Sequence, residues 1–149
     1  MVYTVTQSYE TKAHMGMIDV TGDFQRAVEV ACRETGMKSG IVTGFCTGGV
    51  AGLTTIEFEP GLVDHDLKEA LEKVAPYLNE KGDLVAYKHQ DTWHDNNGSS
   101  HIKAALPSPF ITVPFVEGKI LVGPWQNFTL VECDNLDRHR EVIYQVMGE

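Results

Sequence analysis

Half of the six histidines of this chain lie in one stretch, YKHQDTWHDNNGSSHIKAAL (residues 87–106). The imidazole nitrogens of His89, His94 and His101 could bind a divalent metal, with Asp91 or Asp95 as an oxygen ligand. Their spacings match no compact metal motif such as H-E-x-x-H. The same stretch is rich in Asp, Asn, Gly and Ser, which is typical of a solvated turn. A functional site and a plain polar loop are therefore both open.

Four other polar residues could carry chemistry. Glu57 lies toward the end of the strand-like run GLTTIEFEP, where a carboxylate is either desolvated and reactive or, as exposure statistics favour, turned to solvent. Gln126 follows Trp125, which we expect in the core, and offers a donor and an acceptor from a rigid strand. Arg138 and Arg140, in DNLDRHREV, could bind an anion, but an ion-pair rim is the favoured interpretation for these arginines alone.

Two further motifs are weaker. Asp64 and Asp66 begin an expected helix, where carboxylates favour the positive end of the helix dipole without any further role. The run TGGVAG, with Gly48 and Gly49, resembles a phosphate-binding turn but lacks the full pattern of known phosphate loops. Neither motif predicts a site by itself.

Composition narrows the class of protein. A chain of 149 residues with 42% hydrophobic content is most simply one domain, residues 1–149. A net charge of −9 argues against broad nucleic-acid binding, which needs a basic surface. The three cysteines are scattered and the N-terminal residues do not resemble a signal peptide. No apolar run approaches the ~18 residues of a membrane span. We therefore expect a cytoplasmic protein without a membrane partner.

Helices and strands alternate early in the chain. Period-2 patterns predict strands at VYTVTQSY and MGMIDV, followed by strands at GIVTGFCT and GLTTIEFE. Apolar residues from Phe24 to Ala31 have helical spacing and predict a helix over residues 23–35, ended by Gly36. A second apolar stripe predicts a helix within residues 60–77, stopped by Pro76.

The rest of the chain is mostly strand and turn. Residues 83–89 read as a short strand or extended segment, residues 90–99 as a loop, and a short helix is expected to begin at His101. Four β-rich runs follow, FITVPFV, EGKILVG, WQNFTLVEC and REVIYQVMG. The pattern predicts an α+β domain with antiparallel or mixed sheets.

In this order, AGLTTIE, VDHDL, YKH, SHIKAAL, EGKILVGPWQ and the D-x-x-x-R-x-R run before MGE resemble the YjbQ-like family. The resemblance spans residues 4–149. Many members of this family are described as secondary thiamine-phosphate synthases. The resemblance implies a sandwich of sheets with two main helices and a short third one. It also implies a homotrimer with a cleft near the subunit boundaries.

The matching motif positions imply roles for particular residues. The implied catalytic residues are Glu57, His89, His101 and Gln126. Lys103 and Arg140 would contact the phosphates of an anionic small molecule, and the ligands of a divalent metal, Mg²⁺ or Zn²⁺, would be Asp66, His89, His94 and His101. One position departs from the pattern, because the H-T-T-A motif of the family begins with histidine and Gly48 stands there in this chain.

Three functions stay open. The first is coupling of a pyrimidine diphosphate to a thiazole phosphate, as in thiamine-phosphate synthesis, as a native or a side activity. The chain has no paired-acid diphosphate motif, which argues against this as the native role. The second is a metal- or anion-binding trimer with another reaction, served by general acid–base groups. The third is a non-catalytic binding protein, which the glycine at position 48 favours.

Overall fold

Two antiparallel β-sheets form the body of the protein. The computed structural model describes residues 1–149. One sheet has the strand order β1 (Val2–Thr11), β8 (Arg138–Gly148), β3 (Ser39–Cys46), β5 (Phe110–Val116) and β6 (Lys119–Ile120). The other has the order β2 (Gly16–Asp19), β7 (Asn127–Glu132) and β4 (Ala51–Ile56). All strand pairs are antiparallel, so the expected α+β class is confirmed.

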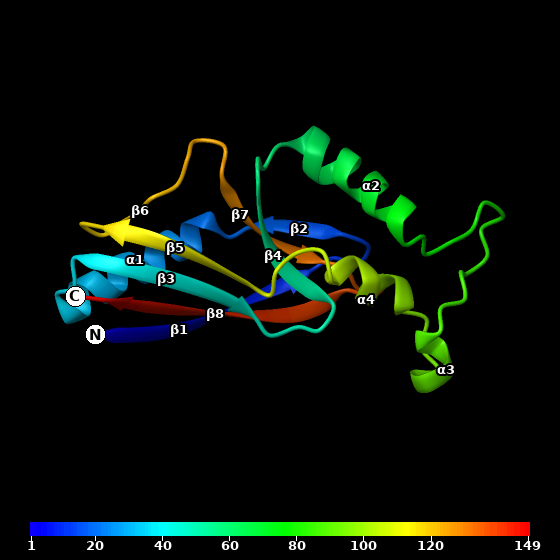
Figure 1. The fold of residues 1–149 in the computed structure, drawn as a ribbon, viewed down its shortest axis with the longest axis horizontal. Helices are drawn as coiled ribbons and strands as arrows, with labels where there is room; N and C mark the ends of the chain where they lie inside the picture. Colours follow the sequence, from blue (N-terminus) through cyan, green and yellow to red (C-terminus); the bar gives the residue numbers. More distant parts are fainter.

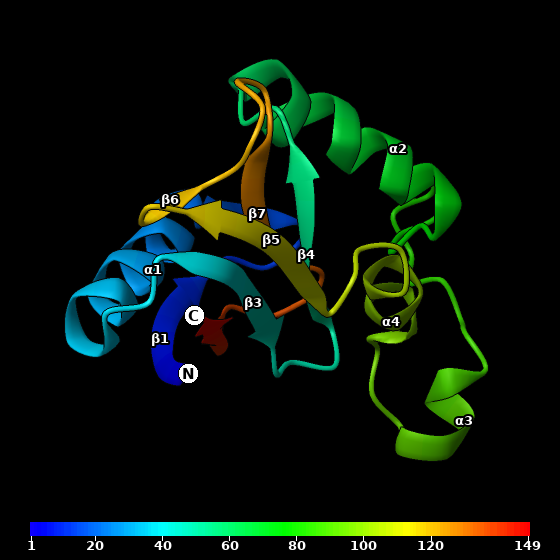
Figure 2. The ribbon, with the colours of Figure 1, turned by 60° about the vertical axis from the view of Figure 1, so that its left-hand side comes forward.

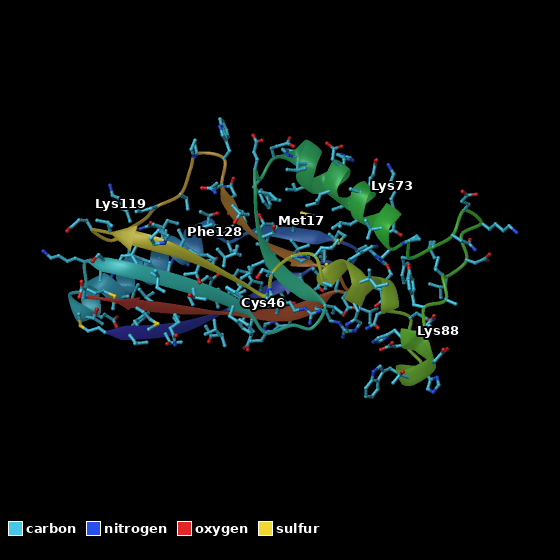
Figure 3. All side chains as sticks on the ribbon, viewed as in Figure 1. Met17, Cys46, Lys73, Lys88, Lys119 and Phe128 are labelled. Carbon is cyan, nitrogen blue, oxygen red and sulfur yellow. The ribbon has the colours of Figure 1, made fainter.

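Helix α1 (Thr21–Thr35) joins the two sheets through one core. The apolar side chains expected to face inward, from Phe24 to Ala31, are all buried. They pack with Phe128 of β7 and Tyr144 of β8, and Figure 3 labels Phe128. Gly44 of β3 leaves room for this packing, because a Cβ there would lie 2.4 Å from Phe24 Cζ. Side-chain size at one strand position thus decides how closely α1 approaches the five-stranded sheet.

The outer face of the five-stranded sheet has no helix on it (Figure 2). Alternate residues of its strands point outward, and several are large and apolar. Phe45 pairs with Phe110 on one side and with Ile143 on the other. The most exposed apolar side chains of this face are 41–57% exposed, namely Val2, Ile41, Phe45, Phe110, Val116 and Met147.

The second helical region lies beside the three-stranded sheet (Figure 1). The helix expected within residues 60–77 is a π-helical turn, η1 (Gly61–Asp66), continued by α2 (Leu67–Val74). Glu59 accepts hydrogen bonds from the backbone N–H groups of Gly61 and Leu62, which caps the first turn. None of the helices combines the length and the apolar character that a membrane span requires.

Residues 76–97 form an arm that leaves the body and returns to it (Figures 1 and 2). Residues 83–89 form no regular strand, and Leu78 and Leu84 make a single bridge. The arm carries a short helix, α3 (His89–Trp93), within the segment expected to be a loop. Helix α4 (Gly98–Ala104) then begins three residues before His101, where the sequence indicated its start. The fold therefore has four α-helices rather than two main helices and one short one.

Candidate functional site

His89 and His101 meet at the base of the arm. Their rings stack with centroids 4.4 Å apart and planes inclined by 29°. His89 begins α3, whereas His101 lies in α4. Both line an open cleft of about 590 Å³, together with Tyr87, Lys88 and Ile102. Figure 3 shows Lys88 on the arm, away from the sheets. Two histidines of the predicted site are thus brought together.

A glycine makes this meeting possible. A Cβ on Gly98 would lie 2.5 Å from Tyr87 Cβ and 3.3 Å from His89 Cβ, so a larger residue cannot fit without a shift. The returning chain is fixed by hydrogen bonds as well. Tyr87 Oη donates to the carbonyl of Pro76 over 2.7 Å, and Ser99 Oγ donates to the carbonyl of Ala75 over 2.5 Å. Close packing at Gly98 therefore sets how near His89 comes to α4.

The electrostatics of the cleft favour a neutral imidazole at His101. Burial and the neighbouring His89 lower the pKa of His101, against the opposing effect of Asp95 and Asp134. His89 Nδ1 lies 3.1 Å from Asp95 Oδ1, but the groups are not aligned for a hydrogen bond. Asn97 Oδ1 is also buried without a partner. The cleft thus offers a proton acceptor at His101, while the two unsatisfied polar atoms lie buried at and beside it.

The residues do not assemble a metal site within one chain. No group of three or more His, Cys, Asp and Glu side chains is placed to hold a metal ion. His94 ends α3 in the left-handed region with φ 58°, and its side chain is exposed. Asp66 is exposed at the end of η1. The donor set predicted from the sequence, Asp66, His89, His94 and His101, therefore does not fit a metal in the isolated chain.

Glu57 and Gln126 lie at the far end of the β4–β7 ladder. Ile56 pairs with Asn127 at that end, whereas Ala51 pairs with Glu132 at the other. The ladder between these pairs is about 17 Å long at the usual rise per residue. Helix α4 packs at the Glu132 end, since Ala104 contacts the cluster that contains Cys133 (residues Met15, Val131 and Cys133). One small molecule cannot reach both groups of residues within one chain.

The Gln126 side chain has a local partner. Gln126 Oε1 accepts a hydrogen bond from the backbone N–H of Gly123 over 2.8 Å, which stabilises the turn before β7. Trp125 in this turn is 70% exposed, so its expected place in the core was wrong. The residue precedes the strand rather than lying in it, and no element covers it. Glu57 is exposed, as the usual exposure of glutamate favoured, and its carboxylate makes no hydrogen bond within the chain.

Both side chains expected to hold phosphates are bound to carboxylates. Arg140 Nε and Nη2 donate to the two oxygens of Glu132 over 2.7 and 2.9 Å, and Nη2 lies 3.4 Å from Asp134 Oδ2. The hydrogen bonds to Glu132 raise the pKa of Arg140. Lys103 is 3% exposed and its ammonium donates to Glu72. Arg140 therefore forms ion pairs in this chain, as the interpretation from its sequence context favoured.

Glu132, Asp134 and Glu72 belong to this region and were not recognised in the sequence. Glu132 is 0% exposed, and its carboxylate also accepts from Thr11 Oγ1 over 2.6 Å and from the N–H of Asp134 over 3.0 Å. A signal existed, because Glu132 stands inside the apolar run FTLVEC and an arginine follows a few residues later. A buried carboxylate in such a run requires a cationic partner.

Gly48 lies against the arginine of this network. A Cβ at Gly48 would be 3.1 Å from both Arg140 Cδ and Arg140 Nη1. A histidine at this position would compete with the guanidinium for space. The glycine therefore allows Arg140 to approach the turn between β3 and β4.

The fold and the cleft define a small α+β protein with two curled antiparallel sheets and a histidine-lined cleft beside a projecting arm. The chain belongs to the UPF0047 protein YjbQ-like family, whose model matches residues 5–149. A UPF0047 protein of Archaeoglobus fulgidus is 32% identical over 93% of this chain and 96% of its own length. A second, from Methanothermobacter thermautotrophicus, is 28% identical over 99% of this chain and 94% of its own length.

Solved structures support the same assignment. A crystal structure of a protein of unknown function from Sulfolobus solfataricus has a TM-score of 0.84 at 26% identity, covering 100% of this chain and 99% of that chain. A structure of a YjbQ/UPF0047-family protein from Clostridium acetobutylicum has a TM-score of 0.77 at 28% identity, covering 96% and 99%. The resemblance found in the sequence motifs is thereby confirmed.

Proposed function

We propose that the protein binds a small anionic molecule at the His89–His101 cleft and acts on it by general acid–base chemistry. The observation that carries the proposal is the stacked histidine pair in an open cleft, where the pKa of His101 is lowered. An imidazole that is neutral near pH 7 can accept a proton from a bound substrate. The ammonium of Lys88 at the cleft suits an anionic group, because its pair with Asp91, at 3.4 Å, is fully exposed and easily exchanged.

Thiamine-phosphate synthase-like coupling is the first reaction to test. It requires cations on the departing diphosphate. Lys103 and Arg140 are neutralised by Glu72 and by Glu132 in this chain, which favours a side activity over a native one. A different proton-transfer or hydrolytic reaction at the same histidines fits the charge balance better. Non-catalytic binding is a second candidate, favoured by Gly48, where the family motif has histidine.

We further propose that the working form is a homotrimer. Its support is the outer face of the five-stranded sheet, where apolar rows such as Ile143–Phe45–Phe110 are left without a covering layer. Monomeric proteins rarely expose apolar patches of this kind. A polar row, in which Thr43 Oγ1 and Thr112 Oγ1 lie 2.8 Å apart, separates two apolar ones. Such alternation suits a specific contact with a second copy of the same chain.

A trimer would also give the remaining motif residues a role. Glu57 and Gln126 of one chain could approach the His89–His101 cleft of a neighbouring chain, which they cannot reach within their own. A divalent metal, Mg²⁺ or Zn²⁺, could likewise bind where two chains of the trimer meet. This prediction requires a ligand from a second chain, because one chain lacks a sufficient donor set.

The test compares His101→Ala and His89→Ala with His65→Ala, a control that removes an exposed histidine on η1. Binding of inorganic pyrophosphate and thiazole phosphate is measured by calorimetry, and thiamine phosphate formation by chromatography. We expect the two cleft variants to lose binding at least tenfold and the control to match the native protein. Equal binding in all four proteins would refute the proposed cleft.

Metal content is measured on tag-free native protein by elemental analysis, with thermal shifts in Zn²⁺ and Mg²⁺. Stoichiometric metal that disappears in His89→Ala would support His89 as a metal ligand. The same metal content in His89→Ala and His65→Ala would remove the histidine pair from consideration as ligands.

A further inference from the structure

One ion pair joins the helix before the arm to the helix after it. Glu72 lies in the last turn of α2, before the arm, and Lys103 lies in α4, after it. The two residues are 31 positions apart, yet Lys103 Nζ donates to Glu72 Oε2. The lysine side chain is 4% exposed and the glutamate side chain 47% exposed. A contact between such distant positions orders a long segment of chain.

The carboxylate of Glu72 is held at both oxygens. Oε2 accepts from Lys103, and Oε1 accepts from the backbone N–H of Tyr77, the second residue of the arm. These hydrogen bonds lower the pKa of Glu72 against the effect of burial. The carboxylate therefore stays charged near neutral pH and cannot turn freely about its side chain.

Helix α4 has few apolar contacts to fix it. Its buried residues are Gly98, Ser99, Ser100 and Lys103, none of which carries a large apolar group. Ala104 alone packs against a small apolar cluster, that of Met15, Val131 and Cys133. Apolar burial normally positions a helix, and here most of it is missing. The directional side-chain contacts of α4 with the rest of the protein are this ion pair and the hydrogen bond from Ser99 Oγ to the Ala75 carbonyl.

We propose that Glu72 and Lys103 are positioning residues, which hold α4 so that His101 stacks on His89 of the arm. His101 and Lys103 are two residues apart on the same short helix, so fixing the ammonium fixes the place of the imidazole. His89 lies between the two ends that the ion pair joins. The proposal rests on the His89–His101 cleft being the functional site, but the ion pair itself acts on the geometry of the rings.

The matched variants are Glu72→Gln and Glu69→Gln. Both remove one carboxylate from α2, but Glu69 is exposed and makes no ion pair. Glutamine keeps the shape of Glu72 and leaves the buried ammonium without a countercharge, which is strongly unfavourable. Two readouts need no ligand. Stacked rings shift the histidine C2 and C4 proton resonances, and amide hydrogen exchange reports opening of residues 89–104.

For Glu72→Gln we expect the ring resonances of His89 and His101 to move toward free-histidine values. Exchange of the α3 and α4 amides should become faster by about tenfold or more, while β3 and β8 amides remain unchanged. Glu69→Gln should match the native protein in both respects. Unaltered ring resonances in a folded Glu72→Gln protein would overturn the proposal, whether or not the cleft binds a substrate.

The native protein provides a test even if Glu72→Gln fails to fold. Native-state hydrogen exchange in low urea should then show α3 and α4 opening together, with the same dependence on denaturant, because the Glu72–Lys103 ion pair holds both helices in place. Opening of α3 at a different denaturant dependence from α4 would overturn the proposal. Pyrophosphate binding by His101→Ala tests the proposed function and not the ion pair.

Discussion

Replacing Gly98 with alanine is expected to disturb the histidine cleft. The new Cβ would lie 2.5 Å from Tyr87 Cβ, whereas ordinary contacts are 3.4–4 Å, so the arm must move by about 1 Å. Overpacking of this kind costs about 1–3 kcal/mol. The helix preference of alanine returns up to about 1 kcal/mol. We therefore expect a net loss of about 1–2 kcal/mol in the free energy of unfolding.

The assay is thermal and urea unfolding followed by circular dichroism, with Gly49→Ala as the control. A Cβ at Gly49 meets no atom within 4 Å, and its φ is not positive. A loss of 1–2 kcal/mol lowers Tm by roughly 2–8 °C in a protein of this size. Gly98→Ala should also weaken ligand binding at the cleft, whereas the control should do neither. A Gly98→Ala protein with native Tm and an intact histidine stack would refute the packing argument.

Three further predictions concern the buried network, the cleft and the sheet face. Glu132→Gln should lower the free energy of unfolding, measured in urea, by about 3–5 kcal/mol, because the buried guanidinium of Arg140 loses its carboxylate. The control, Asp137→Asn, changes an exposed ion pair and should leave the urea midpoint unchanged. The C2 proton of His101 should titrate below the ordinary histidine range. As the pH drops through the ordinary histidine range, the unfolded chain is protonated at His101 before the folded protein is, so the free energy of unfolding falls. Titration of His101 at or above the ordinary range would contradict the prediction. Phe45→Asp should reduce the native mass in light scattering, while Leu136→Asp, away from the sheet face, should not; equal masses would exclude this face as the contact.

Local patterns were sufficient for the elements with a buried face. Helix α1 follows from the spacing of Phe24 to Ala31, and Gly36 ends it in the left-handed conformation with φ 78°. The strands followed from alternation and from turn residues. Both periodicities arise because one face of each element meets the core, so they are visible in the sequence itself.

The arm could not be predicted in this way. Residues 76–97 contact little of the core, and their backbone is fixed by side-chain hydrogen bonds such as that between Tyr87 Oη and the Pro76 carbonyl. Such bonds leave no periodic signal. The start of α4 was misplaced for the same reason, because its first residues, Gly98 to Ser100, are small or polar and buried by the arm.

The same contrast applies to the site. The sequence by itself determined the α+β class, the family and the interest of His89 and His101, because motif residues and hydrophobic periods are local properties. Only the tertiary structure decided that these two rings stack, that Glu57 lies at the other end of the β4–β7 ladder, and that Arg140 and Lys103 are engaged by carboxylates. Those facts depend on contacts between residues far apart in the chain, and geometry and desolvation determine which residues pair as ions.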